Sequence, residues 1–334
     1  MSFVKLVEEY RGGVLENVHY GAVSVVDERG NVLYKAGDPD HMTFLRSAAK
    51  PFQAIPAMKR RIDEVYGLVS EETALFAASH RGESYHIAAL ESILRKTGIS
   101  EDTLHCCATY PLNEDAKAER HRANEQKRRI FHNCSGKHSG LIALSRKMGW
   151  DESTYYEPSH PVQQEIIETL AYIAEVPKES IPVGIDGCGL PVHALPLNKI
   201  ALSFVKLACP DLIGDPETRD AAARMAKAMN DNPDMIADRS FVCSALLKDP
   251  NLSAKGGAKG VYGIGLRKER IGISLKVSDG SEQVWPSIIA SILERIGYDN
   301  NDTIKRLYDL VPNTIANDGG TIVGERKAVF SLQA

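Results

Sequence analysis

The sequence predicts an α+β fold in which an antiparallel sheet is flanked by helices, and two observations favour it. Segments rich in β-branched residues lie toward both ends of the chain, whereas segments with helical periodicity fill most of the region between them. Strands that enclose a helix-rich middle favour helices packed on such a sheet. Because 43% of the 334 residues are apolar, the chain can also bury a substantial core.

Three stretches carry the strand predictions. Residues 21–34 place valines on both sides of the turn sequence at residues 28–31, which predicts an antiparallel hairpin. Residues 260–266 and 271–277 are separated by a short charged segment and predict a second hairpin. Residues 328–332 are expected to form the last strand.

Several segments between and beside these strands have the periodicity of amphipathic helices. They are residues 52–61, 73–79, 85–96, 137–148, 161–174, 216–229 and 287–296. No internal repeat, low-complexity tract or linker-like charge block interrupts the chain. We therefore expect residues 1–334 to form a single domain, with room for a helix-rich subdomain in its middle.

The charge balance excludes two classes of partner. With 40 basic and 44 acidic side chains, the chain has a formal charge of −4 and no basic excess for a nucleic acid or a membrane surface. No stretch approaches the roughly 18 apolar residues of a membrane span, and glutamates stand where a signal peptide would need an apolar core. We expect a cytoplasmic protein that acts on a small molecule. Its six cysteines are then expected to be free thiols or metal ligands.

A serine and a lysine stand three positions apart in residues 46–51, Arg-Ser-Ala-Ala-Lys-Pro. On a helical turn this spacing puts the hydroxyl of Ser47 and the amine of Lys50 on one face. A serine becomes a nucleophile when a neighbour takes its proton, and a lysine does this when apolar surroundings favour its neutral form. Pro51 restricts the residue before it, so Lys50 either ends one turn or opens the next.

A Ser-x-x-Lys spacing occurs by chance in most chains of this length, usually on a solvated helix face. Its interpretation therefore depends on the other polar motifs in the chain. Ser79 and His80 end a run of small apolar residues and begin a polar cluster, a break typical of an element that enters a cleft. Lys255 precedes a predicted strand, among glycines that permit close backbone approach. Lys255 is therefore a candidate to activate Ser79 as Lys50 activates Ser47.

Two further cysteines suggest a metal site. Cys134 and Cys188 are each flanked by glycine and by other potential ligands. If the two segments meet in space, two thiolates with Asp186, and with His138 or a neutral Lys137 as the fourth group, suit a zinc-like ion that prefers sulfur and tetrahedral packing. A lysine ligand is unusual, because it must first lose its proton. Structural loop cysteines are the alternative interpretation.

Six short motifs follow one another along the chain. They are Arg11-Gly12-Gly13, Arg46-Ser47-Ala48-Ala49-Lys50-Pro51, Ser79-His80-x-Gly82-Glu83, Asn133-Cys134-Ser135-Gly136-Lys137-His138, Ser159-His160-Pro161 and Asp186-Gly187-Cys188-Gly189-x-Pro191. Together they resemble the asparaginase family of the thermolabile, rhizobial type. The likeness spans nearly the whole chain, and several motifs in one order are far more specific than any one of them.

The resemblance implies a fold similar to that of serine β-lactamases and penicillin-binding proteins, and the hydrolysis of L-asparagine to L-aspartate and ammonia. It also implies a homodimer. The implied catalytic groups are two serine–lysine pairs, Ser47 with Lys50 and Ser79 with Lys255. The implied zinc ligands are Cys134, Lys137, Asp186 and Cys188.

One departure from the family pattern concerns the second lysine. Where the family usually reads Gly-Ala-Glu-Gly, residues 257–260 read Gly-Ala-Lys-Gly. Lys259 therefore puts a second amine near Lys255, and we prefer Lys255 as the candidate. Arg46 and His80 are our candidates for contacts to the charged ends of the substrate; a surface ion pair and a buried core histidine are the alternatives for these two residues.

Two other functions share part of this pattern. A penicillin-recognising or peptidase-like serine hydrolase also uses Ser-x-x-Lys, although such enzymes are exported and this sequence predicts no export signal. A zinc-stabilised binding protein without enzymatic activity would use the serines only structurally.

Overall fold

The computed structural model describes residues 2–334, which divide into two compact units. One unit holds the chain up to Ala48 together with Leu195–Val205 and Ser240–Ala334, and the other holds Ala49–Ala194 and Lys206–Arg239. The second unit contains most of the predicted helix-rich middle. The expectation of a single domain over residues 1–334 stays a prediction.

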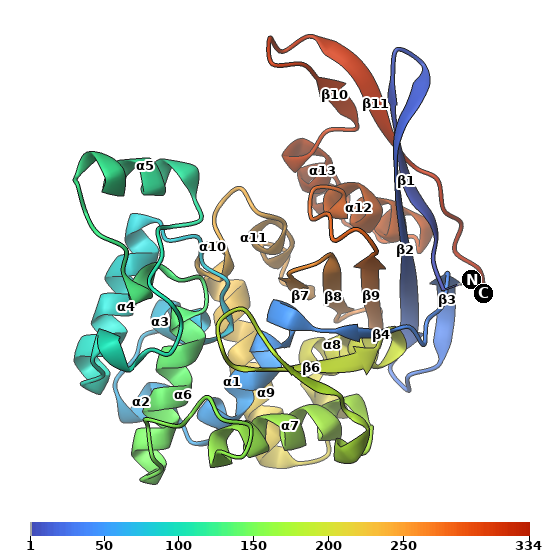
Figure 1. Ribbon diagram of the computed structural model, residues 1–334. Coiled ribbons are helices and arrows are strands. Elements are labelled where there is room, and N and C mark those ends of the chain that lie inside the picture. The colour runs from blue at the N-terminus through green and yellow to red at the C-terminus, as the bar shows by residue number, and fades with distance from the viewer. Residues whose placement is uncertain (1) are drawn as a thin grey trace. The chain divides into compact units, whose positions relative to one another are not determined.

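The first unit is built on one antiparallel sheet, which confirms the predicted α+β class. Its strands follow the order β10-β11-β1-β2-β9-β8-β7, and β3 pairs with β2 (Figure 1). Their bounds are β1 Val4–Arg11, β2 Val14–Asp27, β3 Val32–Ala36, β7 Leu252–Gly257, β8 Val261–Leu266, β9 Ile271–Val277, β10 Thr314–Ala316 and β11 Ile322–Ala328. Strands from the two ends of the chain therefore meet inside the sheet, where β1 pairs with β11 and β2 pairs with β9.

Both predicted hairpins are present. Strands β2 and β3 pair on either side of the turn at residues 28–31, with Val25 opposite Tyr34. In the second hairpin, strands β8 and β9 pair up to their connecting turn, where Leu266 lies opposite Ile271. The predicted last strand at residues 328–332 is wrong, because the strand ends at Ala328. This strand, β11, pairs with β1, and none of its residues is buried. The sequence of β11 therefore lacks the alternation of apolar and polar residues by which strands were predicted.

The sequence interpretation missed β1 and its hairpin with β2. The two strands are joined at Gly12 and Gly13, whose φ angles are +56° and +81°. A two-residue turn of this kind requires the left-handed region at both positions, which glycine adopts without a steric penalty. The Gly-Gly pair was therefore the signal that could have located this hairpin.

Helices cover both faces of the sheet. On β8, Tyr262 packs its ring 5.0 Å from that of Trp285 in α12 (Trp285–Arg295). The next residue, Gly263, faces Phe204 of α8 (Leu197–Ala208) so closely that a Cβ would meet the ring. Since successive strand residues point to opposite faces, α12 and α8 lie on opposite sides. The remaining helices here are α11 Val242–Leu247 and α13 Asn301–Leu310.

Helix α1 (Lys50–Lys59) is the central helix of the second unit. Residues 50–58 are all buried, and the helix contacts α6, α7 and α9. An element that is buried on every side belongs to the interior of a helical cluster. The helices of this unit are α1, α2 Ile62–Val65, α3 Ser70–Ala74, α4 Ser84–Thr97, α5 Glu114–Arg122, α6 Ser135–Met148, α7 Pro161–Ala174, α9 Pro216–Asp231 and α10 Pro233–Ile236.

The helix predictions hold with small shifts, apart from one. The predicted helix at residues 161–174 has the observed bounds of α7, whereas residues 73–79 are not one helix. Helix α3 ends at Ala74, a 3₁₀ turn covers Leu75–Ala77, and Ala78 is extended, with ψ 151°. Helices α2, α5, α8, α10, α11 and α13 were not predicted. Among residues 2–334, no helix combines the length and apolar character needed to cross a bilayer.

Short elements complete the description. Strand β4 spans Met42–Phe44, and β5 (Val183–Ile185) pairs with β6 (Pro191–Pro196) in antiparallel fashion. The 3₁₀ helices are η1 Arg46–Ala49, η2 Leu75–Ala77, η3 Glu101–Thr103, η4 Arg129–Phe131, η5 Lys178–Ser180 and η6 Pro210–Leu212.

Candidate functional site

Ser47 lies in the 3₁₀ helix η1, and Lys50 is the first residue of α1. Of the two options left open for Lys50, the structure therefore shows the second, in which it opens a helix. Pro51 fits the first turn of α1, because no intrahelical acceptor is available to an N–H there. Arg46, just before the serine, has φ +49°, a left-handed conformation that a non-glycine residue rarely adopts and that is enriched at functional sites.

The amino group of Lys50 is completely buried and lies within hydrogen-bond distance of three oxygen atoms. They are the carbonyl oxygen of Ala78 at 2.6 Å, the hydroxyl of Ser79 at 3.0 Å and the carbonyl oxygen of Asn133 at 3.2 Å. These three contacts hold the side chain in one position. The structure thus brings together two of the predicted catalytic residues, Lys50 and Ser79.

Ser79 reaches Lys50 because the chain becomes extended after η2. Its backbone N–H donates to the carbonyl oxygen of Ile236 at 2.8 Å, and that of Arg81 donates to Ala237 at 3.2 Å, like a short strand pairing. Gly82 then turns the chain with φ +79°, against Pro111. These bonds fix the backbone on both sides of His80 and direct the Ser79 hydroxyl toward α1.

Lys255 lies in β7, in the first unit. It is paired with Gly263 and is 1% exposed, and its Nζ donates to the carbonyl oxygen of Gly256 at 2.8 Å. Two residues later on the same face, a Cβ at Gly257 would meet the carbonyl oxygen of Leu45 and the N–H of Ala48. Lys255 therefore shares a sheet face with the backbone around Ser47. Its pairing with Ser79 stays a prediction.

The alternative amine, Lys259, is in a different environment. It stands in the turn between β7 and β8 with φ +68°, and its side chain is exposed. Lys255, in contrast, is 1% exposed. This difference supports the preference for Lys255.

His80 is completely buried beside this cluster. Its Nε2 lies 2.8 Å from the hydroxyl of Ser135, which itself donates to the carbonyl oxygen of Ile130 at 3.0 Å. The serine proton is thus engaged, so the histidine carries its proton on Nε2 and donates. Burial, and then the charges of His86 and Lys50, hold the pKa of His80 well below its ordinary value. The imidazole is neutral, and the predicted substrate contacts of His80 and Arg46 stay predictions.

The two predicted metal-binding cysteines meet in the second unit, as the sequence suggested they might. The thiol of Cys188 donates a hydrogen bond to Cys134, and Lys137 Nζ donates to Cys188 Sγ at 3.3 Å. That hydrogen bond, with the charges of Lys50 and Lys137, holds the pKa of Cys134 well below its ordinary value despite burial. Burial disfavours the Lys137 ammonium, but the charges of Cys188 and Cys134 offset it and raise the lysine pKa.

Asp186 occupies the turn that leads to Cys188. Its backbone N–H donates to the carbonyl oxygen of Leu190 at 2.8 Å, and Gly189 closes the turn with φ +86°. The charge of Asp186 also acts on Lys137. Within residues 2–334, no group of three or more histidine, cysteine, aspartate or glutamate side chains is close enough to hold a metal.

The four predicted ligands nevertheless fit a zinc ion by their chemistry. Two sulfurs and one nitrogen converge, and a carboxylate in electrostatic reach of that nitrogen completes the four donors that tetrahedral zinc takes. A Cys134 thiolate is the form that binds metal, whereas Lys137 must first give up its proton. All six cysteines are free, as expected.

Some contacts at this site had no signal in the sequence. Lys50 uses the carbonyl oxygens of Ala78 and Asn133, and every residue carries such an oxygen. Tyr155 was also missed: its hydroxyl lies 2.5 Å from Nδ1 of His138 and accepts the backbone N–H of His105. This bond engages Nδ1 of the histidine that the sequence offered as an alternative metal ligand.

Comparison with protein families gives one match. The family model described as L-asparaginase II matches residues 7–328, nearly the whole chain. No curated protein matches the sequence.

Several solved structures resemble this one at low identity. The native form of a protein called Mglu is 14% identical with a TM-score of 0.48, covering 84% of this chain and 66% of that chain. A structure described as a putative β-lactamase from Bacteroides dorei is 14% identical with a TM-score of 0.45, covering 82% of this chain and 93% of that chain. A Bacillus glutaminase is 15% identical with a TM-score of 0.35, covering 78% and 84%.

Proposed function

This chain belongs to the L-asparaginase II family, and on that premise we propose that it hydrolyses L-asparagine to L-aspartate and ammonia. Family membership supports an amide hydrolase. The observation that supports a serine–lysine mechanism is the buried amino group of Lys50, which bonds to Ser79 from the helix turn that follows Ser47. This arrangement provides hydroxyl groups and an amine for nucleophilic attack and proton transfer.

In the proposed reaction, Lys50 acts as a neutral amine, and Ser47 Oγ attacks the carbon of the side-chain amide as its proton passes to that amine. The C–N bond then breaks, and ammonia leaves with a proton relayed from Lys50 through the hydroxyl of Ser79. Water attacks the resulting ester, the enzyme releases L-aspartate, and Ser47 regains its proton. Covalent catalysis splits one difficult step into two easier ones. The backbone N–H of Ser47 is our candidate donor to the oxyanion.

A zinc ion held by Cys134, Lys137, Asp186 and Cys188 belongs to the same proposal. A zinc ion supplies a Lewis acid that can orient and polarise a carboxylate or carbonyl oxygen of a substrate. The chain's own contribution is the buried Cys134 and Cys188 pair, which presents one low-pKa thiol in a dry environment. The histidine alternative to Lys137 stays open, because Tyr155 engages only Nδ1 of His138, and Nε2 has no hydrogen-bond partner within residues 2–334.

The direct test is ammonia release from L-asparagine by purified protein, compared with Ser47→Ala. Ser331→Ala is the matched control, because Ser331 is an exposed serine near the C-terminus. We expect turnover in the wild type and the control and none in Ser47→Ala. Normal turnover by Ser47→Ala would reject this nucleophile and favour a structural role for the serines. Opening of a chromogenic β-lactam without ammonia release would favour the penicillin-recognising alternative.

Metal binding has a readout that does not depend on activity. Atomic absorption should find about one zinc per chain, and Cys188→Ser should lower that stoichiometry, whereas Cys107→Ser, at an exposed cysteine, should not. Equal zinc contents in the three proteins would reject these ligands.

A homodimer is the assembly we propose, on the family resemblance alone. Light scattering of the purified chain should give a mass near twice the 36.6 kDa of one chain. A mass of one chain across the micromolar range would reject it.

A further inference from the structure

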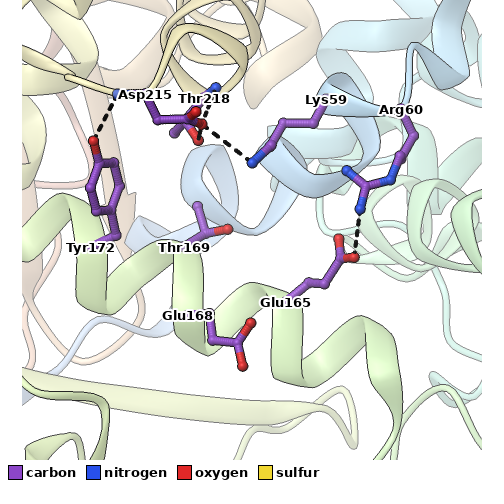
Figure 2. Close-up of a pocket in the computed structure, with 8 residues that line it drawn as sticks. All are labelled: Lys59, Arg60, Glu165, Glu168, Thr169, Tyr172, Asp215 and Thr218. Atoms are coloured by element: carbon purple, nitrogen blue, oxygen red, sulfur yellow. Dashed lines mark hydrogen bonds and ion pairs between the residues drawn. The ribbon is translucent and has the colours of Figure 1, made fainter.

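A pocket in the second unit is lined by none of the candidate catalytic or metal-binding residues. It has a volume of about 360 Å³ and is lined by the end of α1, one face of α7 and the start of α9. Figure 2 shows cationic, anionic and hydroxyl side chains around its opening. Ligand pockets span about 300–1,000 Å³, so this one suits a small ligand.

The cationic side of the pocket is formed by Lys59 and Arg60. Lys59 Nζ is 3.4 Å from an oxygen of Asp215 and 4.0 Å from one of Glu217. Both distances exceed the roughly 2.7–2.9 Å of a charge-assisted hydrogen bond. The same oxygen of Asp215 makes shorter bonds to Thr218, 2.9 Å from its N–H and 2.5 Å from its hydroxyl. Lys59 therefore keeps donor capacity for an anion.

The anionic side is formed by Glu165. One of its oxygens accepts from Arg60 at 2.8 Å, and within residues 2–334 the other makes no side-chain hydrogen bond. Burial raises the pKa of this carboxyl group, which indicates an anion that lacks full solvation. Thr169, one turn further along α7, lies between Tyr172 and Glu165 on that helix, and its hydroxyl makes no hydrogen bond in the described part of the chain (Figure 2).

The wall of the pocket is firm. The hydroxyl of Tyr172 accepts the backbone N–H of Asp215 at 2.8 Å, so the ring is held between α7 and the start of α9. An aromatic ring beside polar groups provides an apolar surface for the carbon skeleton of a ligand.

We propose that this pocket binds a small α-amino acid as its zwitterion, with the carboxylate on Lys59 and Arg60 and the ammonium on Glu165 and Thr169. A ligand of one sign fits less well. An anion such as phosphate would face Glu165, Glu168 and Asp215, whereas a polyamine would face Lys59 and Arg60. Only a ligand with both charges, close together, meets both sides of the pocket. This inference does not depend on the proposed catalytic activity.

The test is equilibrium binding followed by NMR on the full chain, with the amide signals of Thr169 and Tyr172 as local reporters. The probes are pools of the 20 protein amino acids, with inorganic phosphate and spermidine tested separately. We expect at least one pool to shift both signals saturably. Lys59→Met and Glu165→Gln should each weaken that binding at least tenfold. Lys147→Met and Glu157→Gln change exposed residues of the same types and should leave it unchanged.

A filling substitution guards against variants that fold poorly. Thr169→Leu places a larger side chain in the pocket and removes no ion pair. It should abolish the ligand-induced shifts of the NMR signals, while the melting temperature stays close to that of wild type. Three results would overturn the proposal. The first is that no amino acid shifts the amide signals of Thr169 and Tyr172, and the second is that Lys59→Met binds the amino acid as tightly as wild type. The third is that phosphate or spermidine binds and no amino acid does.

Discussion

The amino group of Lys50 bonds to the hydroxyl of Ser79 at 3.0 Å and to the carbonyl oxygen of Ala78, the residue before Ser79, at 2.6 Å. Lys50 therefore links the start of α1 to the extended segment that carries Ser79. A proton can pass between the lysine and the second serine without a bridging water, because the two atoms are within direct hydrogen-bond reach.

Removing this amine should stop proton transfer. Lys50→Met keeps most of the side-chain length and should lower ammonia release from L-asparagine by about 10²–10⁴-fold, the usual contribution of a general base. Lys50→Arg should be similarly inactive, because a guanidinium stays charged at all accessible pH values. Lys147→Met serves as the control at an exposed lysine. Substantial activity in Lys50→Arg would exclude a base role for Lys50.

The bond between His80 and Ser135 should contribute to stability. Both side chains are completely buried, and Ser135→Ala would leave the Nε2–H of His80 without its acceptor. Leaving a buried donor unsatisfied costs about 1–3 kcal/mol. We expect the free energy of unfolding in urea to fall by that amount, with Ser331→Ala unchanged. A loss below about 0.5 kcal/mol would mean that the histidine finds another acceptor.

Gly136 should tolerate no side chain. A Cβ there would stand 2.3 Å from the carbonyl oxygen of Leu75, where α6 packs on η2. Gly136→Ala must push two packed elements apart and should destabilise the protein by roughly 1–3 kcal/mol. Gly319→Ala is the control, since the nearest atom to its Cβ would be 3.5 Å away in an exposed loop. Equal melting temperatures for the two variants would contradict this packing.

Asp249 should make stability depend on acid pH. Burial alone would raise its pKa, but hydrogen bonds from Tyr298 and Thr303 outweigh burial and lower it. A lowered folded-state pKa stabilises the protein at pH values above the unfolded value of about 3.9, and this stabilisation is lost as pH falls through the folded value. Asp249→Asn should therefore be less stable than wild type at pH 7.

The difference in the free energy of unfolding between Asp249→Asn and wild type should become smaller as the pH falls below about 4, because the wild-type carboxylate then takes up its proton. Urea unfolding at several pH values measures it, and Asp318→Asn, at an exposed position, should follow wild type throughout. A difference that stays constant from pH 7 to pH 3 would assign the effect of the substitution to packing rather than to charge.

Local patterns in the sequence were sufficient for many elements. The hairpin of β8 and β9 and the bounds of α7 depend on neighbours within a few positions, where alternation and helical periodicity act directly. Local patterns did not predict strands whose pairing partner is distant in the sequence. Strand β11 is such a strand, because it is exposed and pairs with β1 from the other end of the chain.

The residue types of the candidate site were also readable from the sequence. Ser47 and Lys50 lie on adjacent turns of one segment. The glycines beside Cys134 and Cys188 indicated that each cysteine lies in or next to a loop. What only the tertiary structure decided is which groups meet: Lys50 with Ser79 and the carbonyl oxygen of Asn133, and Cys134 with Cys188 and Lys137. The physical reason is that a buried amino group or thiol must find partners where the fold closes around it, and those partners come from segments whose sequence separation carries no periodic signal.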